Sequence, residues 1–297
     1  MSLLVEGGAL DLWRKAQTGL KRALPGIWPT RQRTLFCIIG NLRGGVLPFE
    51  SFLKNFGDDC DLCLCVGNSY QDSPWRQRAN YIWEIDETDP QVWERIYDGI
   101  SSAWRHHAHV ENLWGPYQGL KGSGMIICAF RQRLHEKLSE LPVVYERYVL
   151  TRADQYYVSN ELPRVKPGRI YIPKGEEYGG VTDRFSVADR ETFLRSLQII
   201  PYIIQNPYLF NNVEKYLKAF YKSSGLRIVK SRRTMYTVGR IDEQTRWRAV
   251  SDIEAPHGGR EYFLKYPSEY ALIEKSFVFR SSGAKGAELK KTSIARL

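Results

Sequence analysis

Residues 145–185 read YERYVLTRADQYYVSNELPRVKPGRIYIPKGEEYGGVTDRF, and this stretch decides the fold class. Its apolar segment, residues 147–151, has the composition of a buried strand and stops at Arg152-Ala153-Asp154. Farther along, a glycine pair is followed directly by Val181-Thr182-Asp183-Arg184. We therefore expect two carboxylates at the ends of two extended segments, each beside an arginine.

Apolar strands and amphipathic helices alternate around this stretch. Before and within it, the pattern predicts strands at 34–39, 61–66, 81–85 and 147–151, and helices at 48–56, 90–110 and 124–140. Beyond it, the pattern predicts helices at 190–204 and 213–223 and short strands at 227–229 and 234–238. Such alternation is typical of an α/β fold with a mainly parallel central sheet flanked by helices.

The same pattern gives the domain organisation. We expect one domain over residues 34–280, preceded by a helical lead-in at 1–33. Residues 281–297 are rich in Ser, Gly, Ala and Lys, which predicts a flexible basic tail.

Three polar segments follow predicted strands: residues 40–43, 67–69 and 152–154. In a parallel sheet the carboxyl ends of the strands share one edge, and ligands bind in the crevice beyond it. We therefore expect these segments to converge on one site although they lie far apart in the sequence.

Asp154 and Asp183 are the candidates for chemistry. A carboxylate at a strand end can hold Mg²⁺ or Mn²⁺ against a diphosphate, with Arg152 neutralising phosphate charge. The alternative is a structural Arg–Asp pair that caps the next turn. Asp183, behind a tight glycine turn, is a candidate general base for an acceptor hydroxyl. Its alternative is a turn aspartate bonded to nearby amides, and the residues alone leave both questions open.

Two further positions carry weaker signals. Ser123 lies between two glycines ahead of a helix, where it fits either an anion-binding turn or, more simply, a helix N-cap. His257 lies in a glycine turn and fits either a metal ligand or an exposed loop histidine.

The cysteines and glycine loops exclude several common sites. Cys60, Cys63 and Cys65 have part of a zinc spacing, but no second half follows, and their alternation with apolar residues predicts a buried strand. The glycine loop after the first strand matches neither the P-loop nor the dinucleotide-binding fingerprint.

The bulk composition favours anionic partners. The net charge is +10 and aromatic residues make up 13% of the chain, which suits binding to phosphates, sugars or bases. The basic residues are dispersed, so a phosphorylated small molecule fits at least as well as nucleic acid. Without a signal peptide pattern or a long apolar stretch, the sequence predicts a cytoplasmic location and no membrane span.

Six segments resemble a group of GT-A-like glycosyltransferases found in large algal viruses, algae and marine microbes. They are IIGNLRGG, KGSGMIICAFRQRL, YERYVLTRADQYY, IYIPKGEEYGGVTDRF, RRTMYTV and FLKYPSEY. The TRAD strand end and the PKGEEYGGVTDR block are the most specific. The resemblance implies a Rossmann-like GT-A domain that binds a nucleotide-sugar, with an acidic strand-end motif holding Mn²⁺ or Mg²⁺. Here Arg152-x-Asp154 replaces the usual Asp-x-Asp, which puts metal dependence in question.

The resemblance also distributes roles among the residues. It makes Asp183 the base and Asp154 the metal and diphosphate ligand, with His257 as a further metal ligand. Arg152 and Lys265 would supply positive charge to the leaving group, while Gly40, Asn41 and Arg43 would contact the nucleotide. By the same analogy, the implied reaction is an inverting transfer of a sugar to a glycan or glycoprotein acceptor. The donor would be UDP-linked, with UDP-xylose, UDP-glucose and UDP-galactose as candidates, and the product a virion or surface glycan.

Two other functions remain open from the sequence. A basic nucleic-acid-binding protein would use the charge and the aromatic side chains, although no known nucleic-acid motif appears. A non-catalytic carbohydrate-binding module would use the aromatic residues but leave the two acids unexplained.

Overall fold

The computed structural model describes residues 34–281 except for residues 58, 87–88, 108–123 and 244–252. The expected lead-in at 1–33 and the tail beyond residue 281 lie outside the described residues. No described helix is both long enough and apolar enough to cross a membrane.

The main sheet has seven strands in the order β3-β2-β1-β4-β7-β6-β8. Its strands are β1 Thr34–Gly40, β2 Cys60–Gly67, β3 Tyr81–Ile85, β4 Arg147–Thr151, β6 Arg169–Pro173, β7 Ser186–Ala188 and β8 Arg227–Ser231. The first four run parallel, as do β6 and β8, while β7 is antiparallel to both of its neighbours. The sheet is therefore mainly parallel, which confirms the predicted fold class.

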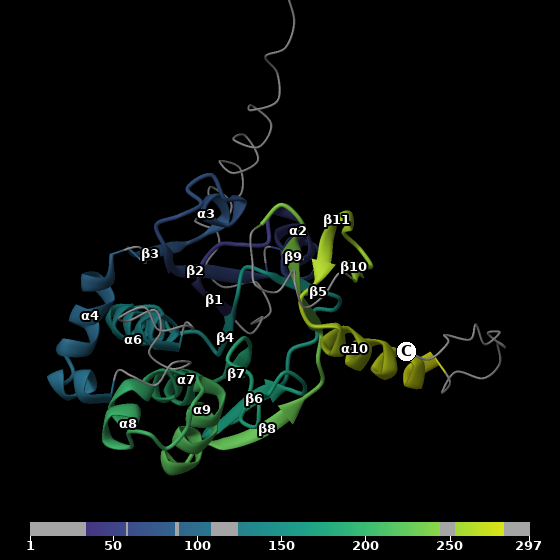
Figure 1. Cartoon of the computed structure of the whole chain (residues 1–297). Helices are drawn as coiled ribbons and strands as arrows, with labels where there is room; N and C mark the ends of the chain where they lie inside the picture. The colour runs from purple at the N-terminus through teal and green to yellow at the C-terminus, as the bar shows by residue number, and fades with distance from the viewer. Residues whose placement is uncertain (1–33, 58, 87–88, 108–123, 244–252, 282–297) are drawn as a thin grey trace, which may run out of the picture. The chain divides into compact units, whose positions relative to one another are not determined.

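Both faces of the sheet are covered (Figure 1). Phe36 and Ile38 of β1 pack in a cluster with Phe52, on the side of α2 Val46–Phe56 and α3 Pro74–Arg78. Leu35 and Cys37 pack on the opposite side with Leu134, in a cluster formed with α6 Gly124–Glu140 and α7 Arg190–Leu197. This double burial explains why β1 reads as an unbroken apolar run in the sequence.

The cysteines of β2 belong to this core. Cys60, Cys63 and Cys65 are buried and form no disulfide, and Cys60 faces the α2 side while Cys63 and Cys65 face α6. The predicted buried strand is confirmed.

A second, antiparallel sheet begins where β4 ends. Its order is β10-β11-β9-β5, with β5 Gln155–Tyr157, β9 Met235–Arg240, β10 Glu254–Ala255 and β11 Gly259–Leu264. Helix α10, Pro267–Ser281, packs on β9. Asp154 is thus the last residue of the short connection between β4 and β5, directly before Gln155.

A helical cluster covers the remaining part of the core. It contains α4 Pro90–Asp98, the 3-10 helix η1 Ser102–His107, α8 Ile199–Gln205 and α9 Val213–Ser223. The helix predicted over 90–110 ends at Asp98, and a separate 3-10 turn follows it. The helix predicted over 190–204 is interrupted at Gln198, whose ψ is 51°. Pro201 has no N–H to donate to the preceding turn, so the first helix ends before it and a new helix begins at Ile199.

The segment that carries Asp183 is fixed against α9 by close backbone packing. The Val181 amide donates to the Glu214 carbonyl at 3.1 Å, and the Gly180 amide donates to the Glu177 carbonyl at 2.6 Å. A Cβ atom at Gly180 would lie 1.9 Å from the Glu214 carbonyl oxygen. Only glycine allows this approach, so the glycine pair of the sequence serves to dock the Asp183 segment on α9.

We predict that Gly180→Ala destabilises the fold by about 3 kcal/mol, because the backbone of the segment must move away from α9. Urea unfolding of the variant and the wild type measures the loss. Gly99→Ala is the matched control, since Gly99 has helical backbone angles and its added Cβ would meet nothing closer than 3.4 Å. Equal stability of the two variants would contradict the packing argument.

Candidate active site

A cavity of about 510 Å³ lies at the carboxyl ends of β1, β2 and β4. Its lining residues come from these three strand ends, from α6 and from the segment before β7: Ile39, Gly40, Asn41, Arg43, Ser69, Tyr70, Ile126, Ile127, Phe130, Arg152 and Asp183. The sequence predicted that the three strand-end segments converge on one crevice, and this is confirmed. The volume lies within the range of small-ligand sites, about 300–1,000 Å³.

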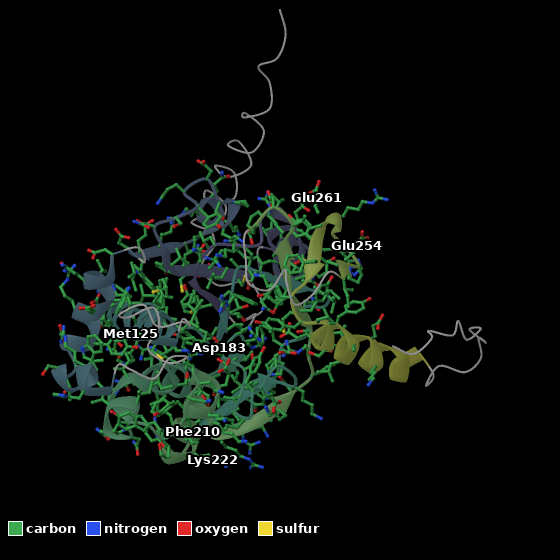
Figure 2. All side chains as sticks on the ribbon, in the orientation of Figure 1. Met125, Asp183, Phe210, Lys222, Glu254 and Glu261 are labelled. Carbon is green, nitrogen blue, oxygen red and sulfur yellow. The ribbon has the colours of Figure 1, made fainter. Side chains whose placement is uncertain are left out.

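Asp183 is the acidic group among the lining residues that the structure describes. Figure 2 shows it away from the periphery of the molecule, and its side chain is 6% exposed. Its main-chain carbonyl accepts a hydrogen bond from Arg131 Nη2 at 3.0 Å, which holds the residue against α6. Its carboxylate has Arg152 Nη1 and Arg184 Nε each at 4.0 Å, and no described residue donates a hydrogen bond to it. The carboxylate thus lies near two positive charges and can still accept a hydrogen bond from a ligand.

Two arginines give the cavity its positive charge. Arg43 is exposed and follows β1, and Arg152 follows β4 with 28% of its side chain exposed. Arg152 Nε lies 3.8 Å from Asp154 Oδ1, and its Nη1 lies 4.0 Å from Asp183 Oδ2. These distances exceed those of hydrogen bonds, so the N–H groups of Arg152 are still available to an anionic ligand.

Asp154 and Lys265 form a buried ion pair beside the cavity, with Nζ to Oδ2 at 2.9 Å. Burial by itself raises the pKa of Asp154, but the charges of Lys265 and Arg152 outweigh it and lower the pKa to about 2. Neither partner is a lining residue of the cavity. The second oxygen, Oδ1, is also buried and accepts no hydrogen bond from the described residues. The pair therefore holds β4 to the second sheet and orients Arg152.

A second set of buried charges surrounds Glu269 and reaches Asp183 through Arg184. Glu269 of α10 lies 2.8 Å from Arg233 Nη1 and 3.7 Å from Arg184 Nη1. Its other oxygen accepts hydrogen bonds from the amide and hydroxyl of Thr237, both at 2.8 Å. Arg184 also donates to the Tyr266 hydroxyl at 2.7 Å. With the Asp154–Lys265 pair, Arg152 and Asp183, four cations and three carboxylates connect the cavity to β9 and α10.

The predicted site residues fall into three groups. Gly40, Asn41, Arg43, Arg152 and Asp183 line the cavity together. Asp154 and Lys265 are buried next to it, in contact with each other.

The other two predicted ligands are Ser123 and His257. Ser123 lies outside the described residues, and His257 is not among the residues that line the cavity. His257 is exposed and stacks on Tyr156, with ring centroids 4.9 Å apart.

Tyr70 was not among the predicted site residues. It lines the cavity with 45% of its surface exposed and has a left-handed backbone, with φ of 59°. A strained aromatic residue that is exposed at a cavity is suited to stacking on a ligand ring. Its position directly after the polar end of β2 is the one signal that the sequence offered.

The expected divalent cation can be tested against this donor set. Among the described residues, no three His, Cys, Asp or Glu side chains lie close enough together to hold a metal. One oxygen of Asp154 is occupied by Lys265, and the other is closed to solvent and faces Arg152. A divalent ion would therefore enter a site whose carboxylates are already neutralised by cations. The residues present do not fit Mn²⁺ or Mg²⁺.

Comparison with known proteins shows a distant likeness in structure. No family model matches this chain, and no curated protein matches it in sequence. Among solved structures, the chain is similar to the crystal structure of mouse xyloside xylosyltransferase 1 in its apo form. The TM-score is 0.39 and the identity is 12%, over 67% of this chain and 84% of that chain. A likeness at this level assigns neither a family nor an activity.

We predict that Asp154→Asn lowers the free energy of unfolding at neutral pH by about 3 kcal/mol, because it leaves the Lys265 ammonium buried without a counter-charge. The pKa of Asp154 is lowered on folding, so its contribution is complete above the unfolded pKa of about 4 and is lost as the pH falls towards 2. The difference between wild type and variant should therefore shrink over that interval. Urea unfolding at a series of pH values measures it.

Asp242→Asn is the control for this experiment, since Asp242 is exposed and pairs with the exposed Arg240. We expect this variant to lose less than about 1 kcal/mol. A deficit of Asp154→Asn that stays constant between pH 7 and pH 2 would show that the ion pair is not its cause.

Proposed function

We propose that this protein is a glycosyltransferase that uses a nucleotide diphosphate sugar as donor. The observation that carries the proposal is the cavity itself. It combines two arginines with one carboxylate that accepts no hydrogen bond from the described residues, at the carboxyl ends of parallel strands. Such a combination suits a donor whose diphosphate lies at the arginines and an acceptor whose reacting hydroxyl faces the carboxylate.

The donor is proposed to lie along the strand ends. Arg43 and Arg152 would contact the diphosphate, and the first turns of α6, which contribute Ile126 and Ile127, would add the positive end of a helix dipole. Tyr70 would stack on the base or the ribose. At Gly40 the φ of 92° and the open space around an added Cβ suit close approach of the nucleotide to the backbone.

Asp183 is proposed as the general base. It would take the proton of the acceptor hydroxyl as that oxygen forms a bond to the anomeric carbon, while the bond from this carbon to the diphosphate oxygen breaks. The departing diphosphate gains negative charge, which Arg152 and Arg43 would stabilise. Attack from the side opposite the leaving group would invert the configuration at the anomeric carbon.

The sequence resemblance supports the finer features of the proposal. The TRAD strand end and the PKGEEYGGVTDR block resemble the group found in large algal viruses and algae, which favours a UDP-linked donor such as UDP-xylose. The same resemblance supports a glycan or glycoprotein acceptor and a role in synthesis of a virion or surface glycan, and we propose that this takes place in the cytoplasm.

The proposal predicts that at least one nucleotide-sugar in a panel of candidate donors raises the melting temperature of the protein. Binding of an anionic ligand to the folded state alone stabilises it by about 2.7 kcal/mol at a hundredfold excess over Kd. Transfer is then measured with the stabilising donor and a set of sugar acceptors. A panel without any stabilising donor would contradict the proposal.

Asp183→Asn should lower transfer at least a hundredfold, because general base catalysis typically contributes about 10²–10⁴ in rate. Its affinity for the donor should stay within a few-fold of wild type, since the substitution removes the base and not the arginines. Asp242→Asn, an exposed acid outside the cavity, is the control and should transfer at the wild-type rate. Undiminished transfer by Asp183→Asn would remove this residue from the mechanism.

A further inference from the structure

Arg152 lies between two carboxylates that come from different parts of the chain. Its Nε faces Asp154 Oδ1 at 3.8 Å, and its Nη1 faces Asp183 Oδ2 at 4.0 Å. The two acids are almost closed to solvent, at 7% and 6% side-chain exposure, whereas 28% of Arg152 is exposed and lines the cavity. Arg152 and Asp183 both line the cavity and Asp154 does not, so the guanidinium lies between the two acids and is the most exposed of the three groups.

The charge balance around Arg152 disfavours a second cation. Lys265 also neutralises Asp154, and Arg184 also faces Asp183. Arg184 and Arg233 also share Glu269, so four cations share three carboxylates, and Arg152 is the cation of this set that lines the cavity. A divalent cation would meet repulsion there, whereas a diphosphate would meet attraction.

The chemistry of the guanidinium suits this position. It is planar, permanently charged and has five N–H donors, so one edge can face carboxylates while the other binds phosphate oxygens. Arg152 makes no hydrogen bond to any described residue, and its donors are therefore not consumed by the protein. An ammonium or a metal ion would bring charge without this arrangement of donors.

We propose that Arg152 takes the place of a divalent cation between Asp154 and Asp183, and that the cavity binds a diphosphate without metal. The identity of the diphosphate ligand rests on the proposed function. The position of Arg152 as the cation between the two acids does not depend on it. Removal of the guanidinium should accordingly turn the two acids into a divalent-cation site.

The first experiment measures Mn²⁺ binding by electron paramagnetic resonance in wild type, Arg152→Ala and Arg152→Lys. Wild type and Arg152→Lys should bind no Mn²⁺ at this position. Arg152→Ala should bind about one ion per chain, at least tenfold more tightly than any other Mn²⁺ that wild type binds. The further change Asp183→Asn should abolish the acquired site. Circular dichroism and the melting temperature establish that each variant is folded.

Arg105 provides a matched control, because it also lies beside two acids. It pairs with Asp98 and lies 3.7 Å from Glu94, but on the surface and with 41% of its side chain exposed. Arg105→Ala should bind no more Mn²⁺ than wild type, since Glu94 and Asp98 have 23% and 36% of their side chains exposed and are more hydrated than Asp154 and Asp183. A gain equal to that of Arg152→Ala would overturn the proposal. So would Mn²⁺ binding by wild type that Asp183→Asn removes, or a folded Arg152→Ala that acquires no site.

The second experiment uses inorganic pyrophosphate as the probe and isothermal titration calorimetry in the presence of EDTA. Wild type should bind pyrophosphate under these conditions, and Arg152→Ala should bind it at least tenfold more weakly. Wild-type binding that requires added Mn²⁺ would overturn the metal-free proposal. Failure of wild type to bind with and without Mn²⁺ would count against the diphosphate ligand and the proposed function, while the Mn²⁺ titration still decides the role of Arg152.

Discussion

The ion pair between Asp154 and Lys265 is the interaction on which the site depends. Asp154 lies between β4 of the main sheet and β5 of the second, and Lys265 follows β11. Main-chain hydrogen bonds of 3.0 Å reinforce the pair, from Val238 to Asp154 and from Lys265 to Thr237. Because separating buried charges would leave each without a partner, the two sheets cannot move apart at this point without a large cost. Arg152, two residues before Asp154, is held at the cavity as a result.

The second charge network extends this constraint to α10. Glu269 accepts from Thr237 and faces both Arg233 and Arg184, so β9, α10 and the segment of Asp183 share one buried carboxylate. Thr237 also accepts a hydrogen bond from Gln155 at 2.8 Å, which brings β5 into the same network. The position of Asp183 relative to Arg152 is therefore set by contacts from both sheets. The proposed role of Asp183 as general base requires such a connection, because a base must be held within hydrogen-bond reach of its substrate.

The sequence predicted the parts of this arrangement that depend on local pattern. The apolar runs of β1, β2 and β4 and the parallel sheet they form were enough to bring Gly40, Arg43 and Arg152 to one edge. The sequence could not show that Asp154 pairs with Lys265, since 111 residues separate them and nothing in the spacing relates them. The strands β5 and β7 have three residues each, too few for a periodicity to appear. The sequence did not predict Tyr70 as a site residue, because the direction of its side chain depends on a left-handed backbone conformation that no sequence pattern indicates.

In the proposed function, Arg152 lies where the glycosyltransferases that the sequence resembles have an acid, and the charges of the two arrangements can be compared. Exchanging a carboxylate for a guanidinium raises the local charge by two units, which is the charge that a divalent cation would bring. A site with Arg-x-Asp and no metal therefore presents a diphosphate with the same net charge as an Asp-x-Asp site that holds one. The cation is then part of the chain and needs no binding equilibrium, but it polarises a leaving oxygen less strongly than a metal does. The additional positive charge of Arg43 at the same cavity, and the surplus of cations around Asp183, compensate in the direction that this weaker polarisation requires.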